Sequence, residues 1–163
     1  MSAHDDDGGS GCEGCSHGLA RRAFLHGGAK GVLALAMIPA CGNPTVSPPS
    51  GPVAGGNLAD LPVGTLRVIG GEGVVIGRDA QGIYAMSASC THAGCLLASA
   101  GGGPAAGLSC SCHGSRFDEN GAVTRGPAAT PLPHYRVDVA SDGTLTIQGA
   151  DPVAADARTP ANS

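Results

Sequence analysis

The 163-residue chain contains few aromatic and few charged residues, and both shortages limit what it can do. Tryptophan is absent and only two Phe and two Tyr are present, so a core must be built from smaller aliphatic side chains. Charged residues make up 13% of the chain, with nine Lys and Arg and a net charge of -4. A basic surface for nucleic acid is therefore excluded. No uninterrupted apolar run approaches the ~20 residues of a membrane-spanning helix.

Glycine, by contrast, is abundant, and the apolar residues follow a strand-like pattern. The 28 Gly and 12 Pro predict many turns and few long helices. Apolar positions in the middle of the chain repeat with a period near 2, which is typical of strands. The expected strands are Thr65–Ile69, Val74–Arg78, 83–89, His134–Val139 and 144–148. The sequence thus predicts a small antiparallel all-β protein with long glycine-rich loops.

Cysteine and histidine gather in two of these loops. The first reads Cys-Thr-His-Ala-Gly-Cys at residues 90–95, and the second reads Cys-Ser-Cys-His-Gly-Ser at 110–115. Two such loops facing each other offer two thiolates and two imidazoles, which suits zinc or an iron–sulfur centre. Zinc loops usually pair like with like, whereas both loops here are mixed. The mixed pairing fits a two-iron cluster, and a non-redox zinc-binding structural domain is the alternative of another class.

The two loops closely resemble those of the Rieske iron–sulfur family. Seventeen residues separate His92 from Cys110, and Gly-Pro-Ala-Ala-Thr-Pro-Leu-Pro at 126–133 resembles the family's proline loop, which covers a third side of the cluster. The resemblance implies a small antiparallel Rieske-type β-sandwich with two cluster-binding loops and one [2Fe-2S] cluster per chain. It further implies four iron ligands, two thiolates on one iron and two imidazoles on the other: Cys90, Cys110, His92 and His113.

The same resemblance assigns roles to residues around the ligands. Cys95 and Cys112 match the positions that form a disulfide between the loops. Ser115 matches a serine whose hydroxyl donates to a bridging sulfide, which raises the reduction potential. Phe117 stands where high-potential members carry Tyr, and Ala93 stands where quinol-oxidising members often carry Leu. Both departures argue against a direct assignment to a cytochrome bc complex.

The N-terminal region resembles an export address. Arg21 and Arg22, followed by Ala-Phe-Leu, resemble a twin-arginine signal, which carries folded proteins across a membrane. Ile-Pro-Ala-Cys at 38–41 resembles a lipoprotein processing box, with Cys41 as the lipidated residue. An uncleaved N-terminal anchor and ordinary cleavage are the alternatives. We therefore expect the protein at the periplasmic face of a bacterial cell membrane.

These observations divide the chain into four parts. We expect a signal segment at 1–40, a Pro/Gly-rich linker at 41–57, the Rieske domain at 58–150 and a flexible tail at 151–163. His134 is interpreted as a surface or edge histidine that binds no metal. Arg116 and Arg125, which flank the cluster, are interpreted as solvated surface charges, with the steering of an anionic partner as the alternative.

The expected function is one-electron transfer by a membrane-tethered Rieske protein. It would be a subunit of a respiratory or periplasmic oxidoreductase without independent catalysis, and its partner would be a cytochrome or a molybdenum oxidoreductase subunit. The alternative is the Rieske subunit of a quinol-oxidising cytochrome bc complex, where the complex has quinol–cytochrome c reductase activity. Ala93 and Phe117 favour the first interpretation.

Overall fold

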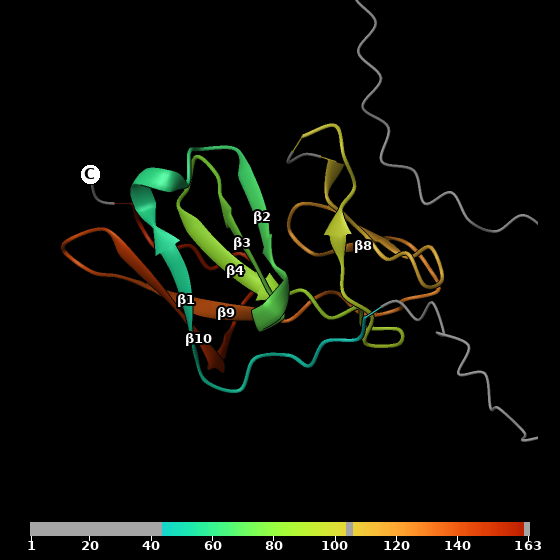
Figure 1. The fold of residues 1–163 in the computed structure, drawn as a ribbon. Coiled ribbons are helices and arrows are strands. Elements are labelled where there is room, and N and C mark those ends of the chain that lie inside the picture. Colours follow the sequence, from blue (N-terminus) through green and yellow to red (C-terminus); the bar gives the residue numbers. More distant parts are fainter. Residues whose placement is uncertain (1–43, 104–105, 162–163) are drawn as a thin grey trace, which may run out of the picture. The chain divides into compact units, whose positions relative to one another are not determined.

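The computed structural model describes residues 44–103 and 106–161, which form two antiparallel sheets (Figure 1). Arg21, Arg22 and Cys41 lie outside these residues. The six-stranded sheet has the order β1-β10-β9-β4-β3-β2. Its strands are β1 (Pro52–Asn57), β2 (Thr65–Ile69), β3 (Val74–Arg78), β4 (Ile83–Ser87), β9 (His134–Val139) and β10 (Thr144–Val153). Two 3-10 turns, η1 (Leu58–Asp60) and η2 (Gly70–Glu72), flank β2.

The four-stranded sheet is made of much shorter strands, which follow the first cysteine-containing loop and flank the second in the sequence. Its order is β5-β6-β7-β8. The strands are β5 (Ala98–Ser99), β6 (Leu108–Ser109), β7 (Arg116–Phe117) and β8 (Val123–Arg125). The all-β class predicted from the sequence is confirmed. Within the described ranges, no helix is long and apolar enough to cross a membrane.

Strands β3 and β4 are buried on both faces, which explains their nearly continuous apolar sequence. Val75 and Met86 pack in one hydrophobic core group with Phe117 and with cysteines of the two cysteine-containing loops. The alternate residues Val74 and Ile76 pack in a second cluster between the strands of the six-stranded sheet. Gly77 is required by this packing, because a Cβ there would lie 2.3 Å from the Tyr84 ring.

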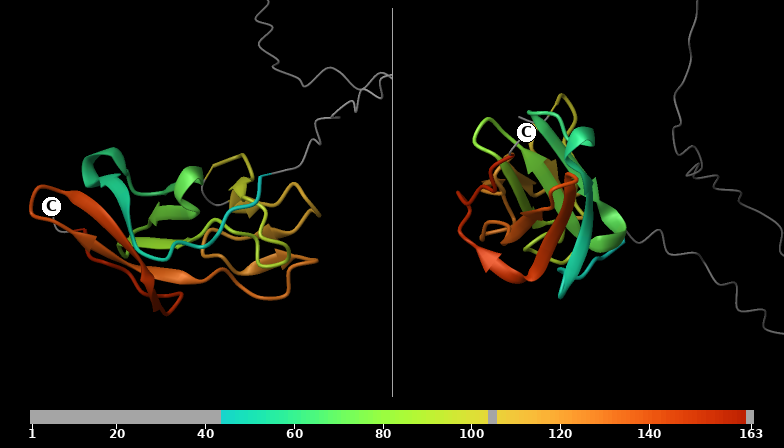
Figure 2. Two further views of the ribbon diagram at one scale, coloured as in Figure 1. Left: turned by 60° about the horizontal axis from the view of Figure 1, so that its bottom comes forward. Right: turned by 90° about the vertical axis from the view of Figure 1, so that its left-hand side faces the viewer.

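The expectation of a linker at 41–57 is wrong for the residues that the structure describes. Residues 52–57 form β1, which pairs with β10 from Pro52–Gln148 to Asn57–Thr144. Residues 44–46, which we call the N-terminal strap, are hydrogen-bonded to the first cysteine loop. Between strap and strand the chain runs along the domain, as the cyan segment of Figure 2 shows. The proline-rich sequence thus belongs to the folded domain.

The expectation of a flexible tail at 151–163 is also wrong for the residues that the structure describes. Strand β10 continues to Val153, and Thr159 forms an isolated bridge with Ile83. Arg158 donates to Asp79 at 2.7 Å and lies 4.1 Å from the centre of the Tyr84 ring. These contacts join the C-terminal segment to β4, so the domain extends well past residue 150.

Candidate metal centre

The two cysteine-containing loops have the same backbone geometry. In the first, the Gly94 N–H donates to Cys90 O at 2.8 Å; in the second, the Gly114 N–H donates to Cys110 O at 3.0 Å. Both glycines have left-handed backbones, with φ of 70° and 76°, which residues with a Cβ rarely adopt. Each loop therefore makes a tight turn between its first cysteine and its glycine.

A disulfide joins the loops, as the Rieske resemblance implied. Cys95 and Cys112 are bonded, with their Cα atoms 6.5 Å apart. The metal-binding donors left over in the loops are Cys90, Cys110 and the two histidines. Cys110 Sγ lies within 4.8 Å of both disulfide sulfurs, but bonded sulfurs hold no charge for a metal. The disulfide thus braces the loops and leaves two thiols free.

The four candidate ligands divide into a buried pair and an exposed pair. The thiols of Cys90 and Cys110 are buried, and each cysteine is 2% exposed. His92 and His113 are exposed, with ring centroids 4.8 Å apart. Burial, together with the neighbouring Cys90, raises the pKa of the Cys110 thiol, so a thiolate there needs a cation for stability. Two buried thiols and two exposed imidazoles from the same two loops fit a two-iron cluster with unlike iron sites.

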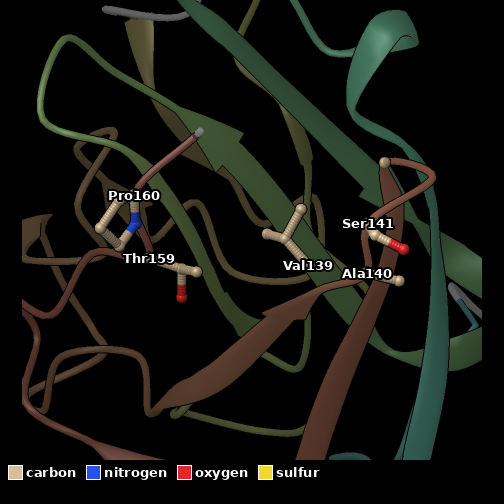
Figure 3. Close-up of a pocket in the computed structure, with 6 residues that line it drawn as sticks. Val139, Ala140, Ser141, Thr159 and Pro160 are labelled. Carbon is tan, nitrogen blue, oxygen red and sulfur yellow. The ribbon is translucent and has the colours of Figure 1, made fainter. Parts of the chain in front are cut away.

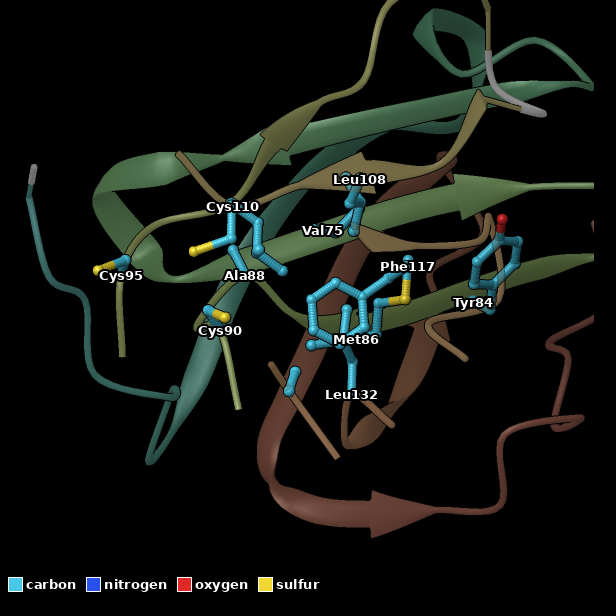
Figure 4. Close-up of a cluster of buried hydrophobic side chains, with 12 residues drawn as sticks. Val75, Tyr84, Met86, Ala88, Cys90, Cys95, Leu108, Cys110, Phe117 and Leu132 are labelled. Atoms are coloured by element: carbon cyan, nitrogen blue, oxygen red, sulfur yellow. The ribbon is translucent and has the colours of Figure 1, made fainter. Parts of the chain in front are cut away.

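Ser115 provides a hydrogen bond donor inside this site. Its side chain is fully buried, and its Oγ accepts a hydrogen bond from the Ala128 N–H at 3.0 Å. Because a hydroxyl can accept and donate at once, its own hydrogen remains available to a cluster atom. Phe117 is 1% exposed and packs in the same apolar group as Cys90 and Cys110 (Figure 4).

The segment at 126–133 is bonded to both loops. The Ala128 N–H reaches Ser115 of the second loop, and Thr91 of the first loop donates through Oγ1 to Thr130 O at 2.8 Å. This segment therefore closes a third side of the site. The Thr91 contact was not predicted from the sequence, where a threonine between cysteine and histidine gives no distinguishing signal.

The N-terminal strap supports the first loop from outside. The Val46 N–H donates to Gly94 O, and the Leu96 N–H donates to Pro44 O, both at 2.9 Å. Thr45 forms a bridge with Cys95. The strap thus hydrogen-bonds on both sides of the disulfide cysteine. No periodic signal marks these residues in the sequence, because two backbone hydrogen bonds require no particular side chains.

Other candidate positions lie away from the loops. His134 is 3% exposed in a central strand, so the expectation of a surface or edge histidine is wrong. Burial lowers the pKa of His134, whose Nε2 has no hydrogen-bond partner among the described residues. A shallow pocket at the β9–β10 turn contains Val139, Ser141 and Thr159 but no titratable side chain (Figure 3). Among the described residues, cysteine and histidine side chains therefore occur together only in the two loops.

The family model for the Rieske [2Fe-2S] domain matches residues 53–136, slightly more than half of the chain. The chain belongs to the Rieske family. A Rieske domain binds a [2Fe-2S] cluster, and the two thiols and two imidazoles described above fit that group in number and kind.

Several Rieske proteins are similar in sequence. The chain is 41% identical over 78 residues to a cytochrome b6-f complex iron-sulfur subunit of Synechococcus sp. (strain WH7803), covering 48% of this chain and 43% of that protein. It is 36% identical over 104 residues to the subunit of the same name in Prochlorococcus marinus (strain MIT 9211), covering 60% and 57%. The chain thus spans about half the length of the curated relatives it matches.

Among solved structures, one similar protein is the cyanobacterial plasma membrane Rieske protein PetC3 from Synechocystis PCC 6803. The match has 27% identity, covers 59% of this chain and 98% of that chain, and has a TM-score of 0.40. The ferredoxin of carbazole 1,9a-dioxygenase from Nocardioides aromaticivorans IC177 matches with 30% identity, 61% and 98% coverage and a TM-score of 0.42.

Proposed function

We propose that this Rieske protein is a one-electron carrier, the electron-transfer subunit of a larger oxidoreductase. The observation that carries the proposal is the separation of the candidate ligands into buried Cys90 and Cys110 and exposed His92 and His113. When bound, the cluster supplies reversible one-electron chemistry. Buried thiolates protect its inner side from water, and exposed imidazoles bring its outer side to the surface, where a partner can approach.

The residues of the chain set the conditions of that transfer. His92 and His113 would each hold the cluster through one ring nitrogen, which leaves the other ring nitrogen available at the surface for a hydrogen bond to a partner. Ser115 is placed to donate to a cluster sulfur, which favours the reduced state. Phe117 stands where high-potential members carry Tyr, and it has no hydroxyl. The second hydrogen-bond donor that such a Tyr supplies is therefore missing. We therefore expect a potential in the middle of the Rieske range of roughly -150 to +300 mV.

Export and membrane attachment are part of the same proposal. The twin-arginine motif at Arg21 and Arg22 supports transport of a folded, cluster-loaded protein to the periplasmic face. The box ending at Cys41 supports a lipid tether, with an uncleaved anchor as the alternative. Pro44 of the strap is three residues after Cys41, and three residues span at most about 11 Å. A lipid on Cys41 would hold the first cluster loop close to the membrane surface.

Two kinds of redox partner are compatible with this proposal. Ala93 and Phe117 favour a periplasmic oxidoreductase, such as one with a molybdenum catalytic subunit. The names of the curated relatives favour a quinol-oxidising complex, because those proteins are iron-sulfur subunits of cytochrome b6-f complexes. In that case the exposed histidines would meet quinol and then a cytochrome.

Visible absorption and electron paramagnetic resonance of the purified full chain test the proposal. We expect a Rieske-type spectrum when the protein is reduced, and a single one-electron transition in a redox titration. Bound zinc with no iron and no visible absorption would contradict the proposal and favour a structural metal domain. Adding a quinol to membranes that contain the protein would separate the two partners, because only a quinol-oxidising complex reduces the cluster directly.

A further inference from the structure

Two arginines beside the cluster loops differ from the others in the described ranges. Of six arginines there, four donate hydrogen bonds: Arg67 to Gly55 O, Arg78 to Leu61 O, Arg136 to Asp138 and Asp151, and Arg158 to Asp79. The side chains of Arg116 and Arg125 make neither a hydrogen bond nor an ion pair with any described residue. Both are exposed. We call these two residues the arginine pair.

The pair is held together by the sheet. Arg116 of β7 and Arg125 of β8 are cross-strand partners next to a β-bulge, so their Cα atoms are about 4.5–5.5 Å apart, and both side chains are exposed. Phe117, the next residue, is buried, which places Arg116 on the solvent side. Like charges directly opposite each other destabilise a sheet. A protein with net charge -4 and few cations thus places two unneutralised cations side by side.

The pair also lies next to the cluster site. Arg116 follows Ser115 directly, and its partner on the other side is Ser109, the residue before Cys110. The acidic residues of the β7–β8 hairpin, Asp118 and Glu119, lie toward its turn. There the Asp118 carboxylate accepts from the backbone N–H groups of Asn120 and Ala122. Arg158 bonds to Asn120 at this same end. The four charges of the hairpin thus sum to zero, but the end of the hairpin that lies next to the cluster site is positive.

We infer that the arginine pair is the docking surface for an acidic face of the redox partner protein. The inference rests on the proposed electron-transfer function and adds the charge of the partner. An acidic surface would neutralise both guanidinium groups and bring its own redox centre next to the exposed histidines. Charge complementarity of this kind mainly raises the association rate, and salt weakens it.

The test uses the full chain and two forms of one probe. Native cytochrome c is basic, and cytochrome c with succinylated lysines is acidic on the same fold. The reduced protein gives one electron to the ferric haem of either form, and stopped-flow absorption measures the rate. Arg116→Gln and Arg125→Gln are compared with Arg136→Gln, which removes the same charge from an exposed site on β9.

We expect each substitution in the pair to slow transfer to succinylated cytochrome c by roughly two- to threefold at low ionic strength, and the double substitution by about fivefold or more. The effect should vanish at high salt, and Arg136→Gln should have little effect. In nuclear magnetic resonance spectra, the side-chain N–H signals of Arg116 and Arg125 should shift on addition of the succinylated probe.

Three results would overturn the inference. An equal loss of electron-transfer rate in Arg136→Gln would mean that only the net charge of the protein matters. Unshifted arginine signals would show that the pair does not touch the acidic probe. Binding of anionic vesicles that depends on the pair, without an effect on the acidic cytochrome, would assign it to a membrane. Because the magnetic resonance experiment needs no electron transfer, a failure of the proposed function, seen as no transfer to either probe, is distinguishable from a failure of docking.

Discussion

Replacing Ser115 by alanine tests the buried hydroxyl of the site in two independent ways. Its Oγ accepts from the Ala128 N–H at 3.0 Å, and its hydrogen is available to a cluster sulfur. Ser115→Ala would leave the buried Ala128 N–H without a partner, which costs about 1–3 kcal/mol. The free energy of unfolding should fall by that amount, because water cannot reach a fully buried site.

The reduction potential should fall as well. A hydrogen bond to a charged acceptor contributes about 1.5–3 kcal/mol, and only the part that differs between the two redox states changes the potential. If about half of it differs, the shift is about 1 kcal/mol, or about 45 mV for one electron at 59 mV per factor of ten. Protein-film voltammetry measures this directly.

Ser87→Ala is the matched control. Ser87 is 1% exposed, and its Oγ accepts from the Ser89 N–H at 3.0 Å, so the lost contact is of the same kind. It belongs to β4 and not to a cluster loop, so this variant should lose stability and keep its potential. Equal potentials for Ser115→Ala and the unchanged protein would show that the hydroxyl donates elsewhere, and its tuning role would be refuted.

Three further predictions concern other parts of the domain. Phe117→Tyr should raise the potential by tens of millivolts at about 59 mV per factor of ten, and an unchanged value would mean that the ring does not face a ligand thiolate. Val46→Pro removes the N–H that donates to Gly94 O and should lower the temperature at which the cluster is lost, whereas Ser47→Pro, which removes no described hydrogen bond, should not. Burial lowers the pKa of His134, so below about pH 6.5 the unfolded chain binds a proton that the folded one does not. Stability should therefore decrease as the pH falls from about 7 to 5, and thermal unfolding of His134→Leu should show a flatter pH dependence. An unchanged pH dependence in His134→Leu would mean that another group causes the decrease.

The sequence predicted the central strands well because their signal is local. Alternating apolar residues between glycine turns located β2, β3 and β9 at their observed bounds, and β4 to within two residues. The cysteine and histidine loops were equally clear, since metal-binding residues at fixed spacing leave few alternatives. The disulfide between Cys95 and Cys112 came from the family resemblance and not from spacing alone.

The parts that the sequence did not predict depend on contacts between distant residues. Strand β1 contains Gly55 and Gly56 behind a proline-rich stretch, and only its pairing with β10 makes it a strand. The C-terminal segment is fixed by Arg158, which bonds to Asp79 across a separation of 79 residues. His134 was misplaced because a histidine between proline and tyrosine gives no sign that β9 lies in the middle of its sheet.

The ligand assignment is the central claim, and nitrogen hyperfine spectroscopy of the reduced protein tests it most directly. Labelling only histidine with nitrogen-15 should reveal two inequivalent nitrogens coupled to the cluster, because His92 and His113 occupy different positions in their loops. The intact two-iron signal should be lost in His92→Ala, while Cys95→Ser, which breaks only the disulfide, should keep a less stable cluster with both nitrogen couplings. A cluster without histidine coupling, or a full two-iron signal in His92→Ala, would contradict the account.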